Sequence, residues 1–137
     1  MDIVSVDPVD WVRSHPQKFF PTGKVEPIGL LAYLMADVVE LGGGTCSMVR
    51  DGEWWLVGSD FDWLQHDRYS ASELFRHVVP APGHGEHSMR GEIFLATFAR
   101  NVSVSLGRDL LRVKGNAPPQ KTVDRAKEFR RAIVFSM

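Results

Sequence analysis

The segment from Glu26 to Gly44 limits the possible folds of this chain more than any other stretch. Its apolar residues recur at the three- and four-residue spacing that predicts a helix with one buried face, namely Ile28, Leu31, Leu34, Met35 and Val38. Pro27 suits the first turn of such a helix, and the three glycines from Gly42 to Gly44 end it. A helix of this kind needs a sheet or a second helix to cover its apolar face.

A β-hairpin is predicted directly after this helix. Residues 45–50 and 53–58 read as strands, and Asp51-Gly52 between them is the strongest short hairpin signal. In an extended strand, neighbouring side chains point to opposite faces, so both faces of the second strand are apolar: Trp54 and Leu56 on one, Trp55 and Val57 on the other. We expect the hairpin to be central and covered on both sides. Its second strand ends in the polar run Ser59-Asp60-Phe61-Asp62, a position where carboxylates could hold a ligand.

The rest of the chain adds two helices, a second hairpin and a short C-terminal unit. A capping box at Ser70–Glu73 predicts a helix over residues 70–78, and Ser88 can cap another over residues 89–100. Residues 102–114 alternate as a hairpin turned at Gly107-Arg108, with one wet and one dry face, followed by a short helix over 122–130 and a strand over 132–135. Residues 1–137 are therefore expected to form one α+β domain, a two-layer sandwich with a mixed, mostly antiparallel sheet and helices on one face.

Composition is that of an ordinary globular domain, with 44% hydrophobic and 24% charged residues. No apolar run reaches membrane-spanning length, and the first residues lack the basic and apolar regions of a signal peptide, so we expect a cytoplasmic protein without membrane contact. Cys46 is the single cysteine, which excludes an internal disulfide framework.

Charge is unevenly distributed along the chain. Residues 1–67 hold 11 acidic and 4 basic residues, a net charge of −7, whereas residues 108–137 hold 3 acidic and 8 basic residues, a net charge of +5. The two ends should attract each other, which favours solubility or self-association into a homo-oligomer. A nucleic-acid surface is not expected, because the basic segment has few aromatic residues and the whole domain is not basic.

Several motifs together resemble the ATPase domain of DNA gyrase and related topoisomerases. Residues 13–19 are similar to the Arg-x-Arg-Pro-x-x-Tyr/Phe motif of that family, and residues 29–40 lie where its long helix follows. Asp60 matches the family's aspartate at the strand end, residues 92–114 its helix and hairpin, and residues 131–136 its closing strand. The resemblance implies the ATPase fold shared by gyrase, heat-shock chaperones, histidine kinases and MutL, the GHKL or Bergerat fold.

The same resemblance implies that the catalytic chemistry is missing. In the family, the long helix carries Glu-x-x-x-Asn, with the glutamate as general base and the asparagine helping to hold magnesium. Ala36 and Glu40 occupy those two positions here. Because alanine cannot accept a proton, hydrolysis by that route is not expected.

The nucleotide-contacting motifs are only partly kept. Asp60 matches the aspartate that accepts a hydrogen bond from adenine, but Asp62 and Leu64 occupy the glycine positions that follow it, where side chains would crowd the pocket. The glycine-rich lid is reduced to Gly83 and Gly85, which could still offer amide groups to an anion or could belong to an ordinary loop.

Each of these candidates has a plainer structural alternative. Asp60 and Asp62 could cap the next turn, since aspartate commonly accepts hydrogen bonds from its own backbone. Glu40 could be a solvated residue near the helix end. His77, His84 and His87 fall within eleven residues and could ligate zinc or another divalent ion, but their spacing matches no established metal motif, and solvated loop histidines are the default.

These observations favour a non-catalytic domain on a degenerate ATPase fold that binds a protein partner or a small ligand and needs no cofactor. The alternative is genuine binding of ATP or ADP with magnesium between residues 29–40 and Asp60. A more distant alternative is a metal-dependent enzyme that uses His77, His84 and His87. Fold analogy raises the prior for nucleotide binding but does not establish it.

Overall fold

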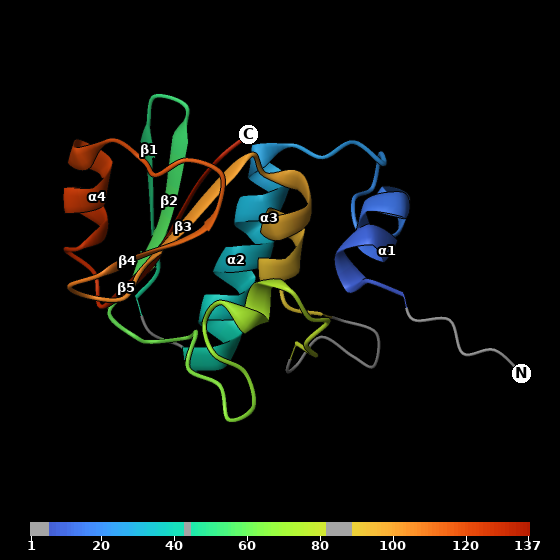
Figure 1. The fold of residues 1–137 in the computed structure, drawn as a ribbon, viewed down its shortest axis with the longest axis horizontal. Helices are drawn as coiled ribbons and strands as arrows, with labels where there is room; N and C mark the ends of the chain where they lie inside the picture. The colour runs from blue at the N-terminus through green and yellow to red at the C-terminus, as the bar shows by residue number, and fades with distance from the viewer. Residues whose placement is uncertain (1–5, 43–44, 82–88) are drawn as a thin grey trace, which may run out of the picture.

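The computed structural model describes residues 6–42, 45–81 and 89–137, and these form an α+β fold (Figure 1). The helices are α1 (Pro8–Ser14), α2 (Pro27–Gly42), α3 (Glu92–Phe98) and α4 (Gln120–Ala126), with two short 3-10 turns at Pro16–Lys18 and Glu73–Phe75. The strands are β1 (Ser47–Asp51), β2 (Trp54–Ser59), β3 (Asn101–Ser105), β4 (Leu110–Lys114) and β5 (Arg131–Ser136). Apart from the helix expected over residues 70–78, the helices and strands expected from the sequence follow one another in the expected order.

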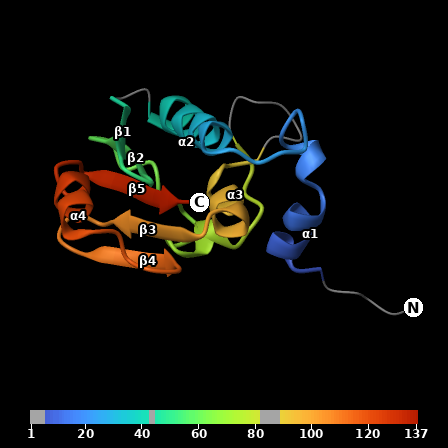
Figure 2. The same ribbon diagram turned by 90° about the horizontal axis from the view of Figure 1, so that it is seen from above.

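The five strands form one sheet in the order β1-β2-β5-β3-β4, and every neighbouring pair is antiparallel. The last strand of the chain, β5, therefore lies at the centre between β2 and β3, and all but the first of its residues are buried. β1 and β4 are the two edges (Figure 2). The expectation of a mostly antiparallel sheet is confirmed.

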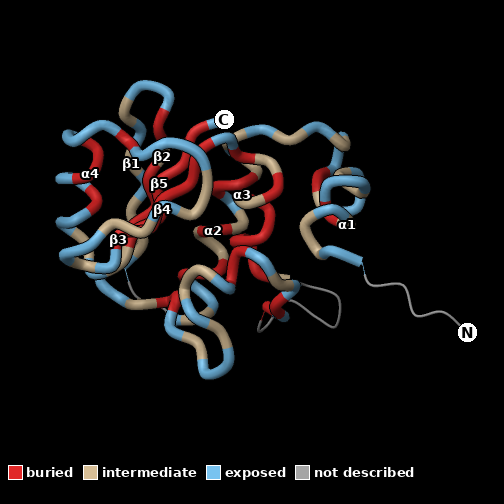
Figure 3. Tube along the Cα trace, viewed as in Figure 1, coloured by how far each residue is buried: buried red, intermediate tan, exposed pale blue. Residues whose placement is uncertain are grey.

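Helices cover both faces of this sheet, so the expectation that they all lie on one face is wrong. α2 and α3 lie on one side of the sheet, and α4 lies on the other (Figure 1). The larger core cluster joins α2 and α3 to the sheet, whereas a smaller one joins Ala126 of α4 to Trp54, Leu56 and Val134. Since β2 and β5 are apolar on both faces, a single helical layer would leave one of these faces in water. The buried residues accordingly run through the sheet and along the inner sides of α2 and α3 (Figure 3).

Helix α2 begins at Pro27 and ends at Gly42, as the sequence predicts. Leu31, Leu34 and Val38 are buried in the larger core, but Ile28 is 63% exposed, so its assignment to the buried face is wrong. At its three- and four-residue spacing, Ile28 shares a helix face with Ala32, Met35 and Val39. Ile28, Ala32 and Val39 are exposed, whereas Met35 is half-buried and packs against the larger core.

The first hairpin is confirmed, with its turn one residue later than expected. Asp51 pairs with Trp54, so Gly52 and Glu53 form the two-residue loop, and Gly52 takes the positive φ of 64° that such a loop needs. Trp54 and Leu56 belong to the smaller core, while Val57 belongs to the larger one. β2 is central and covered on both faces, as expected, but β1 is an edge strand on which Met48 is exposed, so the expectation that the whole hairpin is central and covered is wrong for β1.

The second hairpin also forms, but its expected wet face is buried on β3. Ser103 and Ser105 are 0% exposed. They pair with Val134 and Ala132, on the face of the sheet that α4 covers. The alternation of polar and apolar residues predicted the strand β3 correctly, but the face carrying the serines, which was expected to be exposed to solvent, is buried.

Two of the expected helices are shorter in the structure. Around Ser70, only the 3-10 turn Glu73–Phe75 forms, although the capping box itself is present: the Ser70 amide donates to Glu73 Oε1 at 3.1 Å and the Glu73 amide to Ser70 Oγ at 3.3 Å. The helix expected over residues 89–100 narrows to α3, Glu92–Phe98.

Candidate functional site

The candidate ligand residues within the described part of the chain lie on α2 and just after β2. Ala36 is half-buried on α2, and Glu40 is exposed one turn later. Asp60 is exposed just after β2, where its Oδ2 accepts a hydrogen bond from Thr45 Oγ1 at 3.3 Å. Gly83 and Gly85 lie outside the described residues, so the expected lid is not described.

Asp62 is committed to an ion pair within the protein. Arg131 at the start of β5 donates from Nε to Asp62 Oδ1 at 2.9 Å and from Nη2 to Asp62 Oδ2 at 2.6 Å. Both side chains are largely buried, with 15% and 16% exposure. The hydrogen bonds from Arg131 hold the pKa of Asp62 below its ordinary value. Asp62 also accepts a hydrogen bond from the Leu64 amide at 3.1 Å, which is the turn-capping role weighed from the sequence.

The residues around Asp62 fill the space beside α2. Trp63 and Leu64 are 1% and 3% exposed and belong to the larger core, together with Leu34 and Val38 of α2. Phe61 lies against Gly42 at the end of α2, where even a Cβ atom would overlap the phenyl ring. Residues 61–64 therefore place side chains that pack against α2.

A buried polar cluster joins α2 to the start of α3. Its members are Asp37, Arg90 and Glu92, all at most 3% exposed. Arg90 Nε lies 3.1 and 3.2 Å from the two Glu92 carboxylate oxygens, and Arg90 Nη2 contacts Glu92 as well. The same Nη2 donates to the Trp63 carbonyl at 2.9 Å, and the Gly91 amide donates to Asp37 Oδ2 at 2.7 Å.

This cluster holds two carboxyl groups against one guanidinium, so its charges do not balance when both carboxyls are ionised. Burial, followed by the charge of Glu92, raises the pKa of Asp37 to about 7, although the Gly91 amide and Arg90 act in the opposite direction. A protonated Asp37 removes the excess negative charge. The cluster fixes the chain at residues 90–92 onto α2, and it does so out of contact with solvent.

The sequence did not predict this cluster. Asp37 lies next to Val38 on the buried side of α2. The available signal was an acidic residue within the apolar stripe of a helix, because such a residue must find a buried partner. The hydrogen-bond partner, Gly91, is fifty-four residues away in sequence and could not be named without the fold.

The expected histidine cluster is only partly within the described residues. His77 stacks on Tyr69 with ring centroids 4.7 Å apart, and His66 Nδ1 accepts a hydrogen bond from the Arg68 amide at 3.0 Å. His84 and His87 lie outside the described residues. Within those residues, no three His, Cys, Asp or Glu side chains are placed to hold a metal ion.

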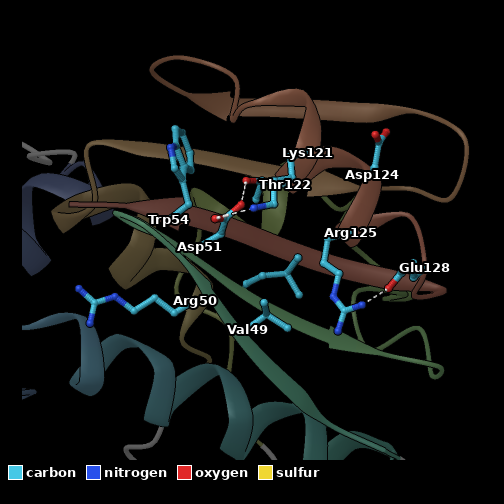
Figure 4. A pocket seen from close by; sticks show the side chains of 10 residues that line it. Val49, Arg50, Asp51, Trp54, Lys121, Thr122, Asp124, Arg125 and Glu128 are labelled. Carbon is cyan, nitrogen blue, oxygen red and sulfur yellow. Dashed lines mark hydrogen bonds and ion pairs between the residues drawn. The ribbon is translucent and has the colours of Figure 1, made fainter.

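A cavity of about 320 Å³ lies on the other face of the sheet, between α4 and the first hairpin (Figure 4). Its apolar floor comes from Val49, Trp54 and Leu56, and its charged rim from Asp51 and from α4 and the residues just after it. Thr122 Oγ1 donates to Asp51 Oδ2 at 3.0 Å, and Arg125 pairs with Glu128 at 2.7 Å. The cavity could accept a small apolar group, and its lining holds three basic and three acidic residues, so their charges sum to zero.

Comparisons with known proteins do not assign this chain: no family profile, no curated protein and no solved structure matches it. No helix in the described residues has the length and apolarity needed to cross a membrane. Function must therefore be argued from the residues themselves.

Proposed function

We propose that this chain is a non-catalytic binding domain on a degenerate ATPase fold, and that its occupant is a protein partner. The order of long helix, hairpin, helix, hairpin and closing strand supports the resemblance to the gyrase and chaperone ATPases, as does the position of α2 and α3 on one face of the sheet. This part of the proposal rests on fold analogy.

The observation that carries the proposal is the ion pair between Asp62 and Arg131, together with the burial of Trp63 and Leu64 beside it. In an active member of the resembled family, the backbone at these positions approaches the base of the nucleotide. Here the equivalent side chains are occupied by contacts within the chain, which opposes nucleotide entry from this side.

No residue near the position of the family's catalytic glutamate is suited to act as a general base. Ala36, at that position, has no acid-base group, and Glu40 occupies the position of the family's asparagine. Asp37, directly after Ala36, has a pKa of about 7, but its side chain is 3% exposed and accepts a hydrogen bond from the Gly91 amide. A base must lie within hydrogen-bonding reach of the attacking water. The proposal therefore assigns Asp37 to structure.

Isothermal titration of the protein with ATP or ADP in the presence of magnesium tests the proposal, together with an assay for phosphate release. We expect no saturable heat and no phosphate release above the buffer rate. Saturable nucleotide binding would contradict it.

Nucleotide binding remains the second candidate, because Asp60 keeps an exposed carboxylate at the end of β2. If heat is observed and disappears in Asp60→Ala, this second reading is correct. Asp67→Ala, a change at an exposed aspartate away from the strand end, is the matched control and should leave any such binding unchanged.

A further inference from the structure

The edge strand β1 is more regular than the opposite edge of the sheet. β4 pairs with β3 through an irregular register at Val102 and Ser103, whereas β1 pairs with β2 in regular register over all five residues. β1 carries two charged residues, Arg50 and Asp51, and contains no proline. Natural sheets often interrupt their edges with bulges or prolines, so a regular edge without either is suited to pairing with another strand whose charges match.

An exposed apolar surface accompanies this edge. Met48 on β1 is 46% exposed. It lies on the α2 face of the sheet, because its pairing partner Val57 belongs to the core shared with α2. On α2, Ile28 and Val39 are 63% and 56% exposed. With Ala32 and the half-buried Met35, they form a row spaced by four, three and four residues, here called the α2 stripe.

The α2 stripe faces away from α3. The Tyr33 ring packs at a tilt against Phe94 of α3, and Asp37 accepts a hydrogen bond from the Gly91 amide, so these residues mark the side of α2 that meets α3. The stripe occupies a different side of the helix, and α2 lies closer to β1 than α3 does (Figure 2). The stripe and the β1 edge therefore belong to the same end of the sheet.

The charges of β1 favour a second copy of this chain as the occupant. When two β1 strands pair antiparallel around Val49, Met48 meets Arg50 of the other copy and Ser47 meets Asp51. No like charges stand opposite each other in this register, whereas parallel pairing would place Arg50 against Arg50 and Asp51 against Asp51. The strand is neutral as a whole, and in this register each of its charges faces an uncharged residue.

We propose that two copies of this chain associate through antiparallel pairing of their β1 strands, with the two α2 stripes facing each other across the symmetry axis. This inference deepens the proposed function, since it names the protein partner. An antiparallel pair has its twofold axis perpendicular to the sheet, so both α2 helices lie on the same face. With strands about 4.8 Å apart, β2 and its copy lie about 14 Å apart. Two α2 helices, each about 10–12 Å across, fit side by side at this separation, one on each side of the twofold axis. The side chains of Met35 and Met48 can fill the gap between them.

Sedimentation velocity over a range of protein concentrations tests this proposal. We expect the wild-type chain to form a dimer that persists at high salt, because backbone pairing and apolar contact are not screened as ion pairs are. A chain that stays monomeric at every concentration would overturn the proposal. So would an association that high salt abolishes, since that behaviour belongs to the attraction between the acidic and basic ends of the chain.

Two matched substitutions at Met48 test the register itself. Met48→Lys places a positive charge opposite Arg50 of the other copy at both symmetric positions, so we expect the dimer dissociation constant to rise about tenfold or more. Met48→Glu introduces a charge of the opposite sign at the same exposed site, and it should keep the dimer because each glutamate then faces an arginine. Equal effects of the two changes would overturn the register, since burial of any charge would then be the cause.

A third variant tests the contribution of α2 independently of the strand. Val39→Glu changes an exposed helix residue, so circular dichroism should show a folded chain, and the dimer should weaken. A dimer unaffected by both Val39→Glu and Met48→Lys would overturn the proposal. Nucleotide titration separates this inference from the proposed function. A dimer that binds ATP would contradict only the proposed function. A monomer that does not bind ATP would contradict only the proposed dimerisation.

Discussion

Asp62, just after β2, and Arg131, at the start of β5, form a two-point ion pair that ties together the ends of two neighbouring central strands. β2 and β5 come from distant parts of the sequence, and Ser59 pairs directly with Arg131. The pair therefore fixes the position at which the chain leaves the sheet. The pair also engages the carboxylate of Asp62, the residue that the resemblance matches to a glycine of the ATPases.

Loss of this pair should destabilise the protein. Arg131→Met leaves Asp62 partly buried without its cation, and we expect the free energy of unfolding at pH 7 to fall by about 1.5–3 kcal/mol. Arg125→Met is the control, because Arg125 pairs with Glu128 at an exposed site and should cost less than about 1 kcal/mol. Urea denaturation measures both. Equal losses would show that the partly buried pair contributes no more to stability than the exposed pair.

The same pair gives a stability term that depends on pH. The pKa of Asp62 is lowered in the folded protein, so its contribution is present above the ordinary value of 3.8 and is lost as the pH falls through the lower folded value. The difference between wild type and Arg131→Met should accordingly shrink in acid. A difference that stays constant down to about pH 2 would contradict the assignment.

Asp37 should produce a pH dependence of the opposite sign. Its pKa rises from 3.8 to about 7 on folding, so the folded protein holds an extra proton between these values. Raising the pH through this window then lowers the free energy of unfolding, on the order of a few kcal/mol in all, with no further change from this group above about pH 7. Asp37→Asn keeps an oxygen for the Gly91 amide and should flatten this slope.

The control for Asp37→Asn is Asp67→Asn, which removes the same charge at an exposed residue. Denaturant titrations from pH 4 to pH 8 should give the wild-type slope for this control. If Asp37→Asn and the control behave alike, Asp37 does not carry the retained proton.

Replacing Arg90 alone should destabilise the protein more than replacing Arg90 and Glu92 together. Arg90→Met leaves Glu92, which is 0% exposed, as a buried charge without its partner, and we expect a loss of about 3–5 kcal/mol. The double variant Arg90→Met with Glu92→Gln removes both charges and should be the more stable of the two. A double-mutant cycle on the free energy of unfolding measures the coupling, and additive losses would contradict it.

Close packing between α2 and α3 should make Gly91 intolerant of a side chain. A Cβ atom at Gly91 would lie 2.8 Å from Tyr33 Cβ and 3.2 Å from the Tyr33 carbonyl carbon, so α3 must shift to admit it. We expect Gly91→Ala to cost about 1–3 kcal/mol in thermal or urea unfolding. Unchanged stability would show that the contact relaxes freely.

The sequence predicted those parts of the fold in which local signals and burial agree. The first hairpin follows from Asp51-Gly52 and from the two apolar faces of β2, and α2 follows from its periodicity and flanking residues. The errors arise where tertiary contacts decide. Ile28 has the spacing of a core residue yet lies on the exposed side of α2, and Ser103 alternates like a surface residue yet lies beneath the α4 layer.

The candidate site was less predictable for a physical reason. Asp60 and Asp62 are similar in sequence context, but Asp60 is exposed whereas Asp62 meets Arg131, which is sixty-nine residues away. Partners at such separations come together only through the strand order. Asp37, Arg90 and Glu92 form a buried charged cluster, and only the packing of α3 on α2 brings them together.

The most direct test of the central claim is the melting temperature of the wild-type chain with saturating ATP and magnesium. A ligand that binds only the folded state must raise this temperature. If the contacts of Asp62, Trp63 and Leu64 close the place where the resemblance to the ATPases would put a nucleotide, the melting temperature stays the same with and without nucleotide. A rise of several degrees that is lost in Asp60→Ala would contradict the account.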